Sequence, residues 1–191
     1  PSVSTSILVS NLIDANWLTF AKFRANYAEV GSSTDPYDVF NTYVVSAPFD
    51  GQGIASLNSR LNNLELKSER SKAWEVGIET SYFDRRLSLD ASYYRTRTED
   101  QITPVPVSNA TGYTRKLLNA GEIENKGVEI LLSGTPIDYN DFSWNVSINW
   151  YRNRNKVISL TDGIENLQLA SLQGGISINA APGEPYGAIR G

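Results

Sequence analysis

The 191-residue chain contains no cysteine and no histidine, and this excludes several kinds of chemistry. It can form no disulfide, no thiolate nucleophile and no cysteine-ligated zinc site, and it lacks the histidine base that most hydrolases use. Its net charge of −4 argues against nucleic acid as a partner. We therefore expect no enzymatic activity, no cofactor and no nucleic-acid binding.

The sequence also lacks features of a complete secreted or helical membrane protein. No apolar stretch reaches the roughly eighteen residues that a membrane-spanning helix needs. The opening residues lack the basic start and apolar run of a secretion signal, and methionine is absent throughout. We expect the chain to be a mature fragment or an interior piece of a longer protein.

Apolar and polar residues alternate along much of the chain with a period of two, which is typical of β-strands with one apolar and one polar face. In WEVGIETSY, residues 74–82, every even-numbered position is apolar or amphipathic and every odd-numbered position is polar or small. The alternation predicts antiparallel strands at about 3–9, 17–30, 72–83, 86–98, 123–134, 142–154 and 176–189.

The lengths of the connections suggest how these strands are arranged. Short connections at 84–86 and 136–141 alternate with longer polar segments at 31–71 and 101–121. In outer-membrane barrels the short turns are periplasmic and the long loops extracellular. The last strand is the weakest prediction, because residues 183–185 read Gly-Glu-Pro, which a central strand tolerates poorly.

Aromatic residues close the ends of the apolar faces. Trp74 and Tyr82 lie eight residues apart, so on a tilted strand they span roughly 20 Å, close to the apolar band of a barrel with aromatic girdles. The predicted membrane girdle consists of Trp74, Tyr82, Phe142, Trp144 and Trp150. This pattern favours an all-β transmembrane barrel, with a soluble β-sandwich as the alternative.

The polar faces carry too many acidic residues for a small barrel. Glu75, Glu79, Asp90 and Glu129 would crowd a closed eight-stranded barrel, whose interior is just filled by side chains. Seven is also an odd number, and bacterial single-chain barrels have an even number of strands. Residues 1–191 are therefore predicted to form one arc of a wide barrel.

Several motifs in the same order resemble the SusC/RagA-type TonB-dependent outer-membrane transporters. These are LKSERSKAWEVGIETSYFDRRLSLDASYY at 66–94, NAGEIENKGVE at 119–129, the segment 142–160, and GEPYG at 183–187. Segment 16–31 is similar to the family strand that precedes a long loop. The resemblance covers nearly the whole chain, and Ser68 departs from it where proline is common.

The resemblance implies a barrel of about 22 strands with a plug domain in its lumen. It implies import of oligosaccharides or oligopeptides across the outer membrane, a SusD-type surface lipoprotein as partner, and energy delivered by TonB–ExbB–ExbD. The family's plug, its TonB-contacting segment and its closing strands have no counterpart in this sequence. A passive porin or structural barrel, and a soluble glycan-binding sandwich, remain as alternatives.

Five residues are candidates for contact with substrate, and each also has a purely structural interpretation. Glu75, Glu79 and Glu129 are candidate lumenal contacts for substrate, although hydration of the wall or ion pairing is favoured. Tyr113 and Phe49, on expected extracellular loops, are candidates for stacking on sugar rings, although packing against other loops is favoured.

The acidic pair Glu122 and Glu124 is a candidate for a Ca²⁺ site. They lack the Asp-rich spacing of calcium loops, so a solvated strand end is the favoured interpretation.

Overall fold

The computed structural model describes residues 1–13, 15–161 and 163–191. The regular structure of the described residues consists of β-strands and three short 3₁₀ helices, and the chain forms two compact units. Unit 1 comprises Pro1–Val30, Lys72–Arg97 and Glu124–Asn155; unit 2 comprises Gly31–Ser71, Thr98–Ile123 and Lys156–Gly191. No helix among the described residues is long and apolar enough to cross a membrane.

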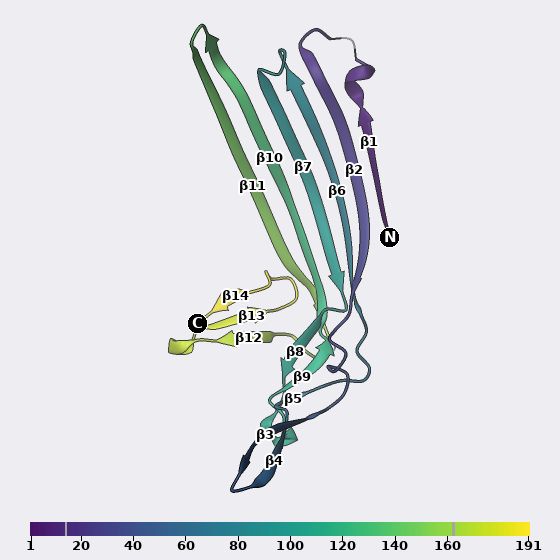
Figure 1. Cartoon of the computed structure of the whole chain (residues 1–191), viewed down its shortest axis with the longest axis vertical. Coiled ribbons are helices and arrows are strands. Elements are labelled where there is room, and N and C mark those ends of the chain that lie inside the picture. Colours follow the sequence, from purple (N-terminus) through teal and green to yellow (C-terminus); the bar gives the residue numbers. More distant parts are fainter. Residues whose placement is uncertain (14, 162) are drawn as a thin grey trace. The chain divides into compact units, whose positions relative to one another are not determined.

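Unit 1 contains most of a six-stranded sheet with the order β1-β2-β6-β7-β10-β11, in which long strands lie side by side (Figure 1). The strands are β1 (Ser2–Leu8), β2 (Leu18–Ser32), β6 (Glu69–Tyr82), β7 (Leu87–Glu99), β10 (Gly121–Tyr139) and β11 (Phe142–Leu160). A short 3₁₀ helix, η1 (Val9–Asn11), follows β1. Six of the seven predicted strands are thereby confirmed.

The β1–β2 ladder shows why alternation fixes the faces of this sheet. Val3 pairs with Tyr27 and Ile7 pairs with Phe23 in an antiparallel register. Paired residues point to the same side, so apolar side chains of both strands share one face.

The seventh predicted strand, at 176–189, is wrong. This segment forms two short strands, β13 (Ser177–Ala180) and β14 (Ala188–Arg190). They belong to a separate three-stranded sheet in which β13 lies between β12 (Leu167–Ser171) and β14. Gly183 and Gly187 adopt left-handed φ values of 88° and 91°, which reverse the chain. Pro185 has no N–H for a ladder, so this sequence turns instead of continuing as a strand.

The predicted short connection at 84–86 is confirmed as a tight turn, whereas the one predicted at 136–141 is shorter than expected, because β10 extends to Tyr139. Phe83, Asp84 and Arg85 all have positive φ, and the Arg86 N–H donates to the Phe83 carbonyl oxygen at 3.1 Å. Positive φ at successive turn residues gives a backbone twist that matches the twist of the flanking strands. Asn140 has the same left-handed conformation between β10 and β11.

Unit 2 shows that the predicted long loops contain small sheets. The hairpin of β3 (Tyr43–Phe49) and β4 (Gln52–Leu57) lies in the first loop. A second sheet has the order β5-β9-β8, built from β5 (Arg60–Leu61), β9 (Arg115–Asn119) and β8 (Ile102–Pro106). The 3₁₀ helices η2 (Asn109–Thr111) and η3 (Gln173–Gly175) are the remaining short elements.

A small apolar core holds part of unit 2 together. Its buried residues are Val105, Ala120, Val157, Leu167 and Ala180. Val157 is fully buried. Its backbone N–H donates to the Glu184 carbonyl oxygen at 2.9 Å, and its carbonyl oxygen accepts from the Gly183 N–H at 2.8 Å. Tyr186 packs against this cluster, and burial raises the pKa of its phenol.

Val157→Ala should weaken this core locally. Removing two fully buried methyl groups leaves a void, and we expect the opening free energy of β12–β14 to fall by about 1–2 kcal/mol. Hydrogen exchange of the full-length protein measures this directly. Val45→Ala, at a position that is 79% exposed on β3, is the matched control and should leave exchange unchanged. Equal protection in both variants would contradict the assigned core.

Candidate functional site: the two faces of the long sheet

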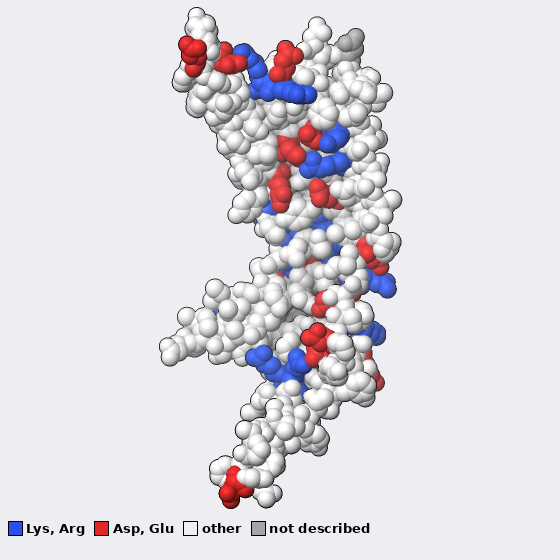
Figure 2. Space-filling model, viewed as in Figure 1, with Lys and Arg blue, Asp and Glu red and all other residues white. Residues whose placement is uncertain are grey.

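One face of the six-stranded sheet carries a network of ion pairs, which we call the charged face. Figure 2 shows acidic and basic side chains gathered in a stripe along the long strands. Arg24 donates two hydrogen bonds to the Asp90 carboxylate, at 3.0 and 2.8 Å, and its Nε lies 3.6 Å from Glu75. Lys22 forms an ion pair with Glu79.

The strand periodicity and one glycine place these charges together. Lys22 and Arg24 are two residues apart on β2, and Glu75 and Glu79 are four apart on β6, so each set shares a face. A Cβ on Gly77 would lie 2.7 Å from Arg24 Nε. The missing side chain lets the Arg24 guanidinium extend across β6 to reach the carboxylate on β7.

A second glycine serves the same purpose further along the sheet. Asn153 of β11 donates from Nδ2 to the Tyr94 hydroxyl of β7 at 3.1 Å, across the intervening strand β10. A Cβ on Gly127 would lie 2.5 Å from that hydroxyl and 2.7 Å from the Arg152 carbonyl oxygen. Glycine in the middle strand therefore permits a long polar side chain to bridge three strands on both occasions.

Glu129 is the exposed acidic residue of the candidate set. It borders a shallow hollow of about 250 Å³ on the charged face, together with Arg24, Asp90 and Asn149. The structure thus brings Glu75, Glu79 and Glu129 to one face; the even spacing predicts this for Glu75 and Glu79, which share β6, and Glu129 joins them from β10. Glu75 and Glu79 are engaged by neighbouring cations.

The opposite, apolar face carries the predicted girdle residues. Trp74 contacts Tyr93 with ring centroids 5.2 Å apart, and Trp17 stacks on Tyr82 at 5.8 Å. Phe142, Trp144 and Trp150 follow one another at even spacing along β11 and are about half exposed or more. Their role as a membrane girdle remains a prediction.

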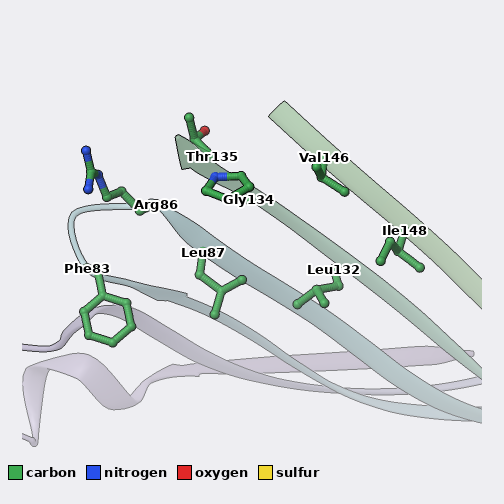
Figure 3. Close-up of a pocket in the computed structure, with 9 residues that line it drawn as sticks. Phe83, Arg86, Leu87, Leu132, Gly134, Thr135, Val146 and Ile148 are labelled. Carbon is green, nitrogen blue, oxygen red and sulfur yellow. The ribbon is translucent and has the colours of Figure 1, made fainter. Parts of the chain in front are cut away.

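A hollow in unit 1 opens on this apolar face. It measures about 530 Å³ and is lined by residues that include Leu87, Leu132, Val146 and Ile148 (Figure 3). Arg86 also lines it, and its guanidinium extends away from the aliphatic cluster. Carbon-lined walls offer a polar nutrient no hydrogen bonds, so we do not assign this hollow to a transported substrate.

The two aromatic candidates of unit 2 lie in different small elements. Phe49 ends β3 beside the Asp50–Gly51 turn and is 76% exposed. Tyr113 follows η2, is half-buried, and donates its backbone N–H to Thr111 Oγ1 at 3.4 Å. No contact in the structure assigns either ring a ligand.

Glu124 corrects the expectation of a solvated strand end. Its side chain is buried, with the whole residue only 5% exposed, and it accepts hydrogen bonds from Arg95 while Lys126 Nζ lies 3.3 Å away. Sequence reasoning missed these partners, as it missed Lys22, Arg24 and Tyr94. Within the described residues, no group of three or more potential ligand side chains is placed to hold a metal.

A sheet of long antiparallel strands, charged on one face and apolar with aromatic residues on the other, is the construction of a membrane barrel wall. Comparison with family models agrees: residues 3–183 match the model described as TonB dependent receptor-like, beta-barrel. The chain therefore belongs to the TonB-dependent receptor-like β-barrel family. Membership excludes the soluble sandwich alternative.

Individual relatives support the SusC/RagA resemblance. The chain is 36% identical over 155 residues to TonB-dependent receptor P3 of Formosa agariphila, covering 80% of the chain and 16% of that protein. It is 27% identical over 160 residues to TonB-dependent receptor SusC of Bacteroides thetaiotaomicron, with 80% and 16% covered. The chain thus spans about one sixth of the length of these relatives.

Solved structures share the fold. A chain of the RagAB peptide transporter superimposes with a TM-score of 0.84 at 24% identity, over 97% of this chain and 20% of that one. The RagAB peptide importer in its 'open-open' state gives 0.76, also at 24% identity, over 96% and 20%. The predicted fold class, an antiparallel arc of a barrel, is confirmed.

The Arg24–Asp90 pair should be energetically coupled in the full-length protein. We expect a double-mutant cycle of Arg24→Gln and Asp90→Asn to give a coupling free energy of about 1–2 kcal/mol, because the pair is bidentate yet partly solvated. Denaturant unfolding in lipid vesicles measures it. Arg85→Gln, in the exposed turn, should cost almost nothing. Strict additivity of the two substitutions would rule out the assigned pairing.

Proposed function

We propose that residues 1–191 form an arc of the wall of a wide outer-membrane barrel that actively imports oligosaccharides or oligopeptides. The observation that carries the proposal is the two-faced sheet in a TonB-dependent receptor-like chain. The charged face lines a hydrated lumen, and the apolar face with its aromatic residues meets lipid. The function involves no bond-making step.

The paired charges support a wall rather than a binding pocket. Arg24 and Lys22 pair with Glu75, Asp90 and Glu79 and compensate two of these three negative charges, so a passing nutrient meets a polar surface whose charges are mostly engaged within the wall. Such a surface permits passage and leaves recognition to other parts of the transporter. Glu129 remains a candidate for contact with substrate, because this residue is exposed on the charged face.

Partners and energy source follow from the proposed class. A SusD-type surface lipoprotein would cover the extracellular mouth, and TonB–ExbB–ExbD would act on a plug domain outside the sequence described. Two names support this assignment: SusC for a relative, and RagAB peptide transporter for a structure with the same fold. Phe49 and Tyr113 are proposed to pack among extracellular loops, with sugar stacking as the less favoured role.

Nutrient uptake should depend on TonB. Cells that carry the full-length protein as their sole importer should grow on the cognate oligosaccharide or oligopeptide, and deletion of TonB should abolish that growth. An unrelated monosaccharide that enters through porins is the control and should support both strains. Uptake that persists without TonB would favour the passive porin alternative.

A new charge should lower the free energy of unfolding much more on the apolar face than on the charged face. Val146→Arg places a cation in the middle of the apolar face of β11 and should cost roughly 2–4 kcal/mol of unfolding free energy in lipid vesicles. Ser147→Arg, the adjacent position on the charged face, is the matched control and should cost far less. If both substitutions changed the unfolding free energy by a similar small amount, the apolar face would not face lipid.

A further inference from the structure

The apolar face of unit 1 ends at a sharp chemical boundary. On β11 the apolar series ends at Trp150 and the next positions on that face are Arg152 and Arg154. On β7 the series ends at Tyr93, and Arg95 and Arg97 follow. Side chains two residues apart on a strand point to the same side, so the face that carries the aromatic residues continues as a charged surface.

The same change occurs on the neighbouring strands. We call the charged positions of this boundary the basic collar: Glu29 on β2, Lys72 on β6, Arg95 and Arg97 on β7, Glu124 and Lys126 on β10, and Arg152 and Arg154 on β11. All eight belong to unit 1. Six of them are basic and two are acidic, whereas the whole chain carries a net charge of −4.

Glu124, an acidic residue of the collar, is paired with two of its basic residues. Glu124 accepts from Arg95 Nε at 2.9 Å and lies 3.3 Å from Lys126 Nζ. It is nearly inaccessible, so it orients these two cations without presenting its own charge to solvent. Arg152 and Arg154 are exposed and follow each other on one face of β11. Arg152 and Arg154 therefore present their guanidinium groups outward, beside Arg95 and Lys126, which a buried carboxylate holds in place.

The position of the collar indicates which surroundings it meets. The collar lies toward the strand ends from which the long segments 31–71, 98–123 and 156–191 depart. The tight turns, one at 83–86 and one that contains Asn140, lie at the other ends of the same strands. Long connections mark the extracellular side of a barrel. Beside the last aromatic residues on that side, outward-facing side chains reach the level of lipid headgroups in the outer leaflet.

We propose that the basic collar binds the phosphate groups of outer-leaflet lipids. This inference rests on the proposed barrel placement and goes beyond it by naming a lipid chemistry. Charge complementarity supports it, since a net positive outward surface next to an apolar band matches an anionic headgroup above acyl chains. Arginine is suited to this role because its planar fork pairs with two phosphate oxygens at once.

Native mass spectrometry of the delipidated full-length protein tests the collar. The probes are a lipid A that carries two phosphates and the same lipid after enzymatic removal of both. The wild-type protein should bind the phosphorylated probe at least about tenfold more tightly, and Arg152→Gln/Arg154→Gln should lose most of that preference. Arg152→Lys/Arg154→Lys should retain part of it, because charge remains.

Controls separate this proposal from the proposed function. Arg115→Gln/Lys116→Gln removes the same charge from β9 of unit 2 and should keep the preference intact. A wild-type protein without preference, or a glutamine variant that keeps it, would overturn the collar while leaving TonB-dependent uptake untouched. Failure of uptake in a protein that still discriminates phosphate would instead overturn the proposed function alone.

Discussion

The pairing of β2, β6, β7 and β10 with neighbours on both sides is the constraint on which this sheet depends. Once the backbone N–H and C=O groups are satisfied within the sheet, side chains alone decide what each face meets. Because the side chains alternate with a period of two, Arg24 and Glu75 lie on one face of the sheet and Trp74 and Val76 lie on the other. A single layer of strands can therefore face lipid on one side and water on the other.

Glycine gives the charged face its connections between strands. Gly77 and Gly127 each lie beneath a long polar side chain that crosses them, Arg24 in one case and Tyr94 in the other. These contacts link strands that are not adjacent in the sheet, so they tie β2 to β7 and β7 to β11. Because both glycines have ordinary strand geometry, space and not backbone freedom explains them.

The fold was largely predictable and the site was not. Alternation placed six long strands because both faces are strongly marked, while the Gly-Glu-Pro segment at 183–185 failed as a strand for reasons visible in its residues. The edge strand β8 contains Pro104 and Pro106, which mask a strand in any sequence pattern. The Arg24 bridge and the burial of Glu124 depend on which strands are neighbours, and alternation alone carries no such information.

The accessibility of successive residues on β11 distinguishes a sheet that separates lipid from water from one that does not. Single spin labels at Val146, Ser147, Ile148 and Asn149 of the full-length protein in lipid vesicles report collisions with lipid-soluble oxygen and with a water-soluble nickel chelate. We expect oxygen access at 146 and 148, on the apolar face, and chelate access at 147 and 149, on the charged face. Uniform access by the chelate at all four positions would contradict a sheet that separates lipid from water.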